Sequence, residues 1–228
     1  MRIIKSISRL LMVGITMLGV CGCMTNNNCN SAESVRDSAL EYLCSRYSDT
    51  FVAKGYSDRS WAYEYATVTF SCEKFAGELI EVRVYKNDDG SYRFEDNYFR
   101  FSMKDEAVSY LEGCLRNSDA EIKVRFPASV WSTDVAGAKT FVAWMNCGTC
   151  VMDIYVLSKT ELSDNVEIDF VNSIASERIR GSINFCVINI LDSVAEMSLD
   201  DFLNNQAEYI QSRNKYYINA EFMIEKLN

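Results

Sequence analysis

Histidine is absent from all 228 residues of the chain. Histidine supplies the general base of Ser-His-Asp and Cys-His sites, a frequent zinc ligand and most proton relays near neutral pH. Its absence excludes these forms of catalysis within the chain. Glycine-rich phosphate loops, dinucleotide-binding glycine patterns and the Gly-x-Ser-x-Gly elbow of hydrolases are missing too. The sequence therefore predicts no cofactor, no metal site and no catalytic residue, and it favours binding over catalysis.

Positive charge is also scarce. The chain has 23 Lys and Arg residues against 32 Asp and Glu residues, a net charge of −9, and no basic cluster stands out. Such a surface repels phosphate backbones, so we do not expect nucleic acid as a partner. Acidic pairs such as Asp88-Asp89 and Asp200-Asp201 do not match the spacing of a calcium loop. We interpret them as residues of turns and helix starts.

The first 23 residues carry the most informative pattern. A head with three basic side chains precedes an uncharged apolar run over residues 10–20, which ends at Val20-Cys21-Gly22-Cys23. This order is typical of a secretory signal peptide, and the run has about half of the roughly 20 residues that a membrane-spanning helix needs. A cysteine directly after a small residue resembles the bacterial lipobox, in which the cysteine thiol receives a diacylglycerol. Gly22 then selects Cys23 for lipidation, and residues 1–22 become the signal peptide.

A second interpretation of this segment stays open. Val20 and Gly22 also suit an ordinary signal peptidase, which would release a soluble secreted protein. Lipidation is favoured because a cysteine just past the cleavage point has no other evident role. The lipobox and the general composition resemble small bacterial lipoproteins of Gram-positive anaerobes, a group with no assigned function. That resemblance implies attachment to the extracytoplasmic face of the cell membrane through Cys23, and it implies no substrate.

The mature chain is long enough for one large domain or two small ones, and the 48% of hydrophobic residues support a buried core. Residues 23–30 form a polar run that we interpret as a flexible tether. The remainder is predicted to divide into two α+β halves, at 31–118 and 119–228. Without the three basic residues of the head, 20 basic residues face 32 acidic ones, a net charge of −12. Anionic lipid headgroups repel such a body, so the lipid must provide the membrane link.

The first half is predicted to be a helix followed by an antiparallel meander. Apolar residues fall at helical spacing over 31–47. Strand-forming residues fill 61–72, and apolar side chains alternate over 80–84 and 92–94. The loop between the last two segments contains Asp89-Gly90, which is typical of a β-hairpin. This order of elements resembles cystatin-like and nuclear-transport-factor-like folds, which serve many functions.

Beyond the meander, helices and strands alternate. Helices are expected at 104–115, 133–145, 162–174 and from Ser198, and strands at 122–126, 151–157, 183–190 and 216–224. The single proline, Pro127, ends the first of these strands. The connections permit parallel βαβ units or an antiparallel sheet, and the sequence leaves that choice open.

Three aromatic residues, Trp61, Tyr63 and Tyr65, alternate along the predicted strand 61–72. Such a row either forms an aromatic face for a ligand or covers the core side of a sheet. Aromatic residues at a spacing of two more often cover the core side. We therefore expect these side chains to face the core.

Nine cysteines are present, and six of them lie beyond the tether. Export makes disulfides possible, but the sequence does not choose among the pairings. Cys147-Gly-Thr-Cys150 resembles the redox motif of thioredoxin-like oxidoreductases, whose reactive thiolate sits at a helix N-terminus after a strand. Here the order is reversed, because Cys147 is expected at the end of a helix or strand and a strand is expected after Cys150, and no Lys or Arg lies within four residues. A local disulfide or two free thiols is the favoured interpretation.

The sequence thus predicts a lipid-anchored, extracytoplasmic α+β protein that binds a partner. That partner would be another envelope protein, or a cell-wall or small-molecule ligand. The alternative is a membrane-tethered thiol-disulfide oxidoreductase that uses Cys147 and Cys150.

Overall fold

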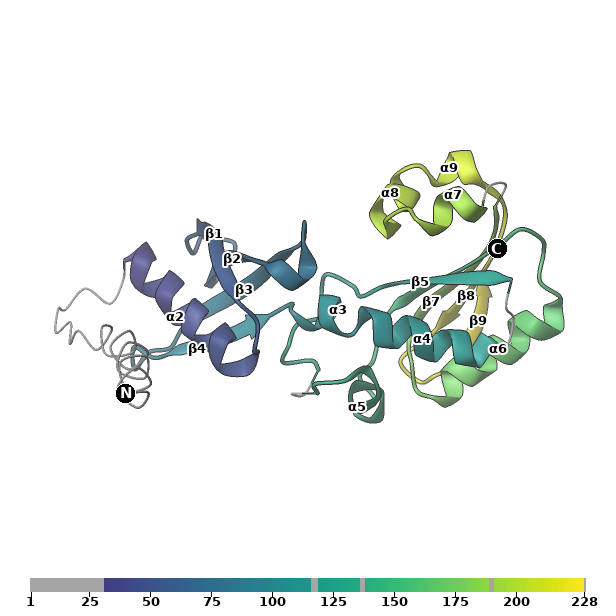
Figure 1. Ribbon diagram of the computed structural model, residues 1–228. Helices are drawn as coiled ribbons and strands as arrows, with labels where there is room; N and C mark the ends of the chain where they lie inside the picture. The colour runs from purple at the N-terminus through teal and green to yellow at the C-terminus, as the bar shows by residue number, and fades with distance from the viewer. Residues whose placement is uncertain (1–30, 116–118, 136–137, 189–190, 228) are drawn as a thin grey trace, which may run out of the picture.

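The computed structural model describes residues 31–115, 119–135, 138–188 and 191–227. Cys23, the predicted signal peptide and the predicted tether lie outside these residues. The chain is an α+β protein, as expected. Its two parts are arranged end to end along the long axis of the molecule (Figure 1). Within the described residues, every helix is too short or too polar to cross a membrane.

The first part consists of one helix and an antiparallel meander, as predicted. Its elements are α2 (Ala32–Arg46), β1 (Phe51–Ser57), β2 (Tyr65–Cys72), the short 3-10 helix η1 (Glu73–Phe75), β3 (Leu79–Lys86) and β4 (Tyr92–Asp96). The four strands pair in sequence order, and each pair is antiparallel. Helix α2 covers one face of this sheet (Figure 1).

Local sequence explains where these elements begin and turn. Ser31 caps α2, because its hydroxyl oxygen accepts a hydrogen bond from the backbone N–H of Ser34. Ala39 and Leu43 lie four residues apart and are fully buried in the core of the first part. The β3–β4 hairpin turns at Gly90, whose φ of 85° favours glycine. The predicted helix and the predicted hairpin are therefore confirmed.

The second part is larger and contains a five-stranded sheet. Its helices are α3 (Phe99–Ser102), α4 (Lys104–Leu115), α5 (Phe141–Asn146), α6 (Asp164–Ser176), α7 (Leu191–Ala195), α8 (Leu199–Asn204) and α9 (Gln206–Tyr209), and its strands are β5 (Ala120–Arg125), β6 (Asp153–Ser158), β7 (Gly181–Ile188), β8 (Ile210–Ile218) and β9 (Ile224–Leu227). The strands lie in sequence order. β6 and β7 are parallel and are connected through α6, and the other neighbours are antiparallel. The sheet is therefore mixed.

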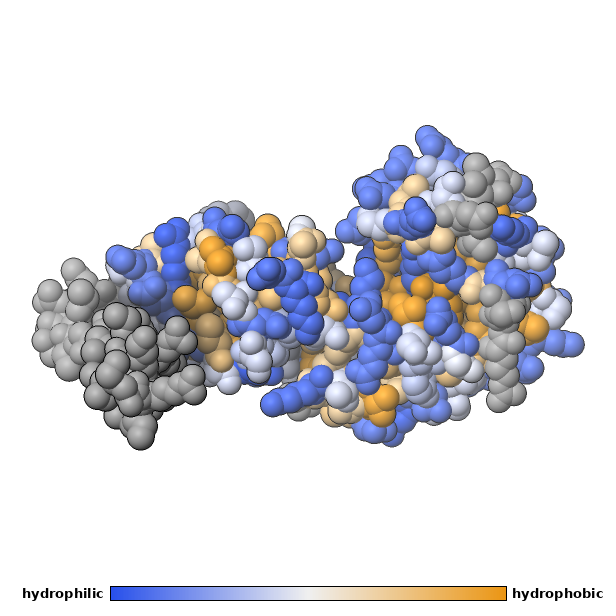
Figure 2. All heavy atoms as spheres, in the orientation of Figure 1, coloured by the Kyte–Doolittle hydropathy of each residue, from blue (hydrophilic) through white to orange (hydrophobic). Residues whose placement is uncertain are grey.

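Helices cover both faces of the second sheet (Figure 1). Ile154 and Val156 of β6 belong to the core that contains residues of α4 and α6. Tyr155 and Leu157 of the same strand belong to a smaller core with residues of α7 and α8. Successive side chains of a strand point to opposite faces, so β6 contributes to both cores. The surface in view is mostly hydrophilic, and apolar residues gather on the second part below α7–α9 (Figure 2).

Three predicted segments differ from the structure. The predicted strand 216–224 divides into β8 and β9, because the chain turns between them with Phe222 at a φ of 61°. The predicted helix 133–145 forms only as α5, which starts after the capping residue Thr140. β2 is shorter than the predicted strand 61–72 at its N-terminal end, and β1 was not predicted.

The chain passes from the core of the first part to the large core of the second over residues 98–103, and Phe101 still packs partly against the first core. Tyr98 packs in the core of the first part, and Phe99 packs in the core of the second. Helix α4 has its predicted bounds, and its buried residues Ala107 and Leu111 also pack in the second core. Helix α4, which the sequence assigned to the first half, therefore packs with the second sheet.

Direct contacts join the two parts at the loop after β5. The backbone N–H of Ser132 donates to the carbonyl oxygen of Asp96 at 2.8 Å, and the Ser132 Oγ accepts from the Asp96 N–H at 2.9 Å. The ring of Trp131 lies 3.6 Å from the guanidinium carbon of Arg83 and 5.2 Å from that of Arg100. This loop of the second part is therefore packed against the sheet of the first.

Candidate functional site

An aromatic patch begins on the face of the first sheet opposite α2 and continues into the turn before β2. Tyr65 of β2 and Tyr85 of β3 are paired across the sheet, with ring centres 5.2 Å apart. Tyr63 continues this row, with its ring centre 5.3 Å from that of Tyr65. Trp61 lies in a tight turn that two backbone hydrogen bonds between Ser60 and Tyr63 close. We define Trp61, Tyr63, Tyr65 and Tyr85 as the aromatic patch.

The alternation of β2 explains why the patch faces outward. Ala66 and Val68 are buried in the core with α2, so Tyr65 points to the other face of the sheet. Trp61 is fully exposed, at 101%, and Tyr63 is 58% exposed. The expectation that Trp61, Tyr63 and Tyr65 face the core is wrong, because the turn at 60–63 places the first two beyond the end of the sheet.

Arginine side chains stack on the tyrosines of the patch. The guanidinium carbon of Arg83 lies 4.5 Å from the centre of the Tyr65 ring, and that of Arg93 lies 3.8 Å from the centre of the Tyr85 ring. Glu95 accepts hydrogen bonds from the Arg93 guanidinium at 2.5 Å and from the Tyr85 hydroxyl at 2.9 Å. Burial and the bond to Glu95 raise the pKa of Tyr85, so its phenol stays protonated as a donor. These contacts hold the rings of Tyr65 and Tyr85 in one arrangement before any ligand arrives.

Apolar side chains are exposed at the other end of the same sheet face. Val52 of β1 and Leu79 of β3 are 53% and 50% exposed, and both are paired with Ser71 of β2, which lies between them. A residue of β3 rises about 3.3 Å along the strand, so Leu79 and Tyr85 are roughly 20 Å apart. Between them the same face of β3 carries the polar residues Glu81 and Arg83, and Trp131 of the second part is stacked on Arg83.

A buried carboxylate fastens α2 to the end of β4. Asp96 is completely buried and accepts hydrogen bonds from the hydroxyls of Tyr42 and Tyr47, at 2.6 and 2.9 Å, and from the backbone N–H of Tyr98 at 3.0 Å. Burial and the charge of Asp96 raise the pKa of both phenols, which therefore remain donors. Three donors satisfy the carboxylate, so this cluster is a structural tie next to the loop that joins the two parts.

The two cysteines of the Cys147-Gly-Thr-Cys150 motif lie in different environments. Cys147 is exposed at the C-terminal end of α5, and its thiol donates to the carbonyl oxygen of Ala143 at 3.3 Å. Cys150 is fully buried in the core of the second part, and burial raises the pKa of its thiol. Both are free thiols, as are the other four cysteines of the described residues. Of the helix or strand that the sequence allowed before the motif, the structure has the helix α5, and a reactive thiolate is disfavoured at Cys150.

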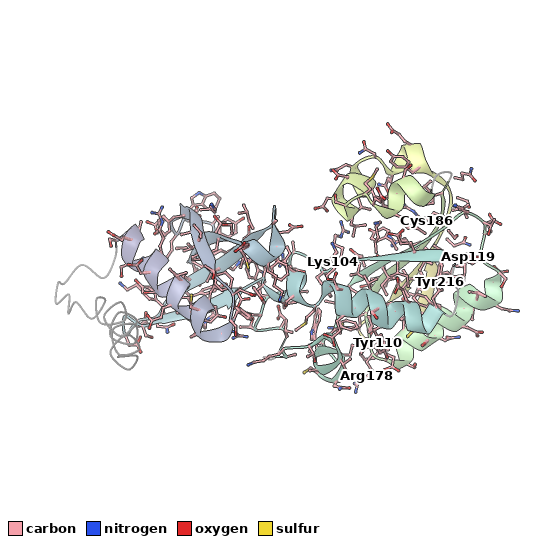
Figure 3. All side chains as sticks on the ribbon, viewed as in Figure 1. Lys104, Tyr110, Asp119, Arg178, Cys186 and Tyr216 are labelled. Carbon is pink, nitrogen blue, oxygen red and sulfur yellow. The ribbon has the colours of Figure 1, made fainter. Side chains whose placement is uncertain are left out.

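Tertiary structure brings two arginines to this motif that sequence spacing did not reveal. The guanidinium of Arg180 donates to the carbonyl oxygen of Thr149 at 3.2 Å. A Cβ atom on Gly148 would lie 3.6 Å from the guanidinium carbon of Arg178, which Figure 3 shows beside α5. The positive charge of Arg180 opposes the effect of burial on the Cys150 thiol, but burial is the larger influence. The parallel bridge between Val151 and Arg180 brings these residues together, although they are distant in the sequence.

Within the residues that the structure describes, His, Cys, Asp and Glu side chains form no group of three that could hold a metal ion. The predicted lipidation site, Cys23, lies outside those residues. Comparison of the chain with protein-family models, with curated proteins and with solved structures finds no match. The aromatic patch is consequently identified by its own geometry, as an exposed and preorganised surface that is suited to contact a partner.

Proposed function

We propose that the protein is a lipid-anchored, extracytoplasmic binding protein that holds another protein of the cell envelope through the aromatic patch. The observation that carries this proposal is the full exposure of Trp61 in a closed turn beside the tyrosine row. A large apolar ring in water gains free energy when a partner covers it. A tight turn lowers the conformational entropy that this residue would lose on binding.

The composition of the patch supports a protein partner. Trp, Tyr and Arg are the residues that dominate binding energy at protein interfaces, because their large side chains combine apolar area with polar contacts. The patch contains three tyrosines and one tryptophan, and Arg83 and Arg93 are stacked on it. Val52 and Leu79 extend the apolar area along the same face. The most exposed rings, Trp61 and Tyr63, project from a turn and do not line a pocket, which suits a protein surface better than a small ligand.

The anchor is proposed from the N-terminal pattern alone. The lipobox-like Gly22-Cys23 would place a diacylglycerol on Cys23, and the polar residues 23–30 would serve as a tether between the membrane and α2. One lipid chain pair of this kind is a sufficient membrane anchor, because burial of each CH₂ group adds about 0.8 kcal/mol. The acidic body would then remain outside the membrane.

The oxidoreductase alternative has weaker support. A thiol-disulfide couple needs an accessible thiolate and a second thiol within bonding reach. Cys147 is exposed, but its partner Cys150 is fully buried with a raised pKa. We therefore do not assign a redox role to this motif.

Site-specific photo-crosslinking tests the proposed surface. A photoreactive phenylalanine analogue in place of Tyr63, in the full chain and in the cells that make it, is expected to cross-link one envelope protein of defined size. The same analogue in place of Val142, which is 44% exposed on α5 of the second part, is the control and should not capture that protein. Trp61→Ala should reduce the Tyr63 cross-link by about tenfold, the loss expected from one hot-spot residue.

Equal cross-linking from both positions, or adducts formed with glycan alone, would contradict the protein partner. The anchor has a separate test, because Cys23→Ala should abolish incorporation of radiolabelled palmitate and move the protein from the membrane to the soluble fraction. Palmitate retained in that variant would contradict the proposed anchor at Cys23, and it would not affect the proposal for the binding surface.

A further inference from the structure

A small pocket opens on the opposite face of the first sheet, at the N-terminal end of α2. Its volume is about 160 Å³. Eight residues from α2, the four strands and the loop after β1 line it: Val35, Tyr56, Asp58, Arg59, Ala66, Val84, Lys86 and Tyr92. The aromatic patch lies on the other face of the sheet, so the pocket is a separate feature.

The inner wall of the pocket is apolar. Val35, Ala66 and Val84 are buried, and Ala66 and Val84 are paired across the sheet. The rings of Tyr56 and Tyr92 complete the lining. A cavity of about 150 Å³ accommodates one benzene molecule, so this volume suits a group the size of a single ring.

The polar side of the pocket is mainly cationic. Arg59 and Lys86 line it, and the guanidinium carbon of Arg36 lies 5.4 Å from the centre of the Tyr56 ring. The single lining carboxylate, Asp58, accepts a hydrogen bond from the backbone N–H of Arg59 at 2.7 Å. Positive charge gathered at an apolar pocket is unusual in a chain whose net charge is −9.

The helix end contributes little net charge. Val35 lies in the first turn of α2, so the positive end of the helix dipole is adjacent to the pocket, but the carboxylate of Glu33 in the same turn opposes it, and the positive potential comes from the basic side chains. The pocket therefore combines an apolar wall, two tyrosine rings and a positive potential. These features together select a molecule that has an apolar body and a negative group.

We propose that this pocket binds a small organic anion, namely a carboxylate attached to one ring-sized apolar group. The ring would occupy the space above Ala66 and Val84, and the carboxylate would be held by Arg59 and Lys86. Both cations are donors that form strong charge-assisted hydrogen bonds with carboxylates. The proposal is independent of the aromatic patch and of the membrane anchor.

Ligand-detected NMR on the full chain in detergent tests the proposal with three probes. Benzoate has the ring and the charge, benzamide has the ring alone, and acetate has the charge alone. Benzoate is expected to bind at least about tenfold more tightly than either of the others, since each loses one of the two contributions. Equal binding of benzamide, equal binding of acetate, or no saturable binding of benzoate by ~10 mM would each overturn the proposal.

Matched variants localise the binding. Arg59→Gln and Lys86→Gln should each weaken benzoate binding by about five- to tenfold, the loss of one charge-assisted bond. Lys54→Gln is the control, because it removes the same charge from an exposed residue of β1 that does not line the pocket. Benzoate affinity that falls equally in all three variants would overturn the assigned site. Arg59 is exposed, so its replacement does not endanger the fold.

Discussion

The two sheets of this protein differ in how their faces are covered. We expect the residues buried at the second sheet to contribute mainly to stability, and the residues exposed at the first sheet to contribute mainly to binding. The second sheet is mixed and has helices on both faces, so side chains on both sides of β6 are buried. The first sheet is antiparallel and has a helix on one face only. Antiparallel sheets tolerate water on one side, whereas a parallel pair with a helical crossover is normally enclosed. The other face of the first sheet is covered only in part, where Trp131 stacks on Arg83, so aromatic residues at its edge stay exposed and can serve a partner.

Two tryptophans provide the strongest test of this comparison. Trp144 is fully buried in the second core, where its ring centre lies 5.4 Å from those of both Phe99 and Phe126. Trp144→Ala should lower the free energy of unfolding by about 3–5 kcal/mol. Trp61→Ala should change it by less than about 0.5 kcal/mol, because Trp61 is fully exposed. Urea denaturation followed by circular dichroism measures both free energies of unfolding. Similar losses in the two variants would show that Trp61 contributes to stability as much as Trp144 does.

The buried carboxylate at the end of β4 should have the next largest effect. Asp96→Ala leaves the hydroxyls of Tyr42 and Tyr47 without their acceptor. An unsatisfied buried polar group costs about 1–3 kcal/mol, so we expect a loss of about 2–3 kcal/mol in the free energy of unfolding. Asp88→Ala is the matched control, because Asp88 is exposed in the β3–β4 loop. A result equal to that control would show that Asp96 does not fasten α2 to the sheet.

Trp131 tests whether the two parts unfold together. Its ring contacts the guanidinium groups of Arg83 and Arg100, one from each part of the molecule. Each desolvated cation–π contact is worth up to about 2 kcal/mol, and Trp131→Ala removes both. We expect calorimetry to show one transition for the natural protein and two for the variant, since the parts have separate cores. A single transition in both proteins would mean that other contacts couple them.

The smallest expected effect on stability belongs to Cys150, whose buried thiol is tested first by its reactivity. Iodoacetamide should modify the exposed Cys147 at least about 100-fold faster than the buried Cys150 in the folded protein, since the reaction at Cys150 needs a local opening. Burial raises the pKa of Cys150, so the folded state keeps the proton that the unfolded chain releases. This contribution to stability is complete below the unfolded pKa of about 8.5 and is lost as the pH rises beyond it. Peptide mapping by mass spectrometry measures the alkylation rate of each thiol. Equal rates of alkylation at Cys147 and Cys150 would contradict the buried position of Cys150.

Elements with strong local signals were predicted well. The α4 helix has the predicted bounds, and the β3–β4 hairpin turns at Gly90 as expected, because amphipathic spacing and a positive φ are properties of a short segment. The packing of α4 was not predictable in the same way. Its apolar stripe would be the same against either sheet, so only the structure shows that α4 packs in the core of the second part.

The candidate sites show the same limit. The row of Trp61, Tyr63 and Tyr65 was visible in the sequence, but a period of two does not state which side of a sheet faces water. Arg180 beside Cys150 was invisible, because a parallel bridge joins segments that are distant along the chain. The pocket with Arg59 and Lys86 combines residues of four strands and one helix, which no local pattern relates.

The α+β class and the helix and meander of the first part could be predicted from the sequence. The absence of histidine chemistry and the lipobox-like pattern at Cys23 can be seen directly in it. These follow from residue types and short spacings, which are local properties. Only the three-dimensional structure shows which sheet is covered on both faces, which elements pack in each core, and that Trp61 and Tyr63 are exposed. Those outcomes depend on contacts between distant segments, where burial on one face of a strand leaves the other face for solvent or for a partner.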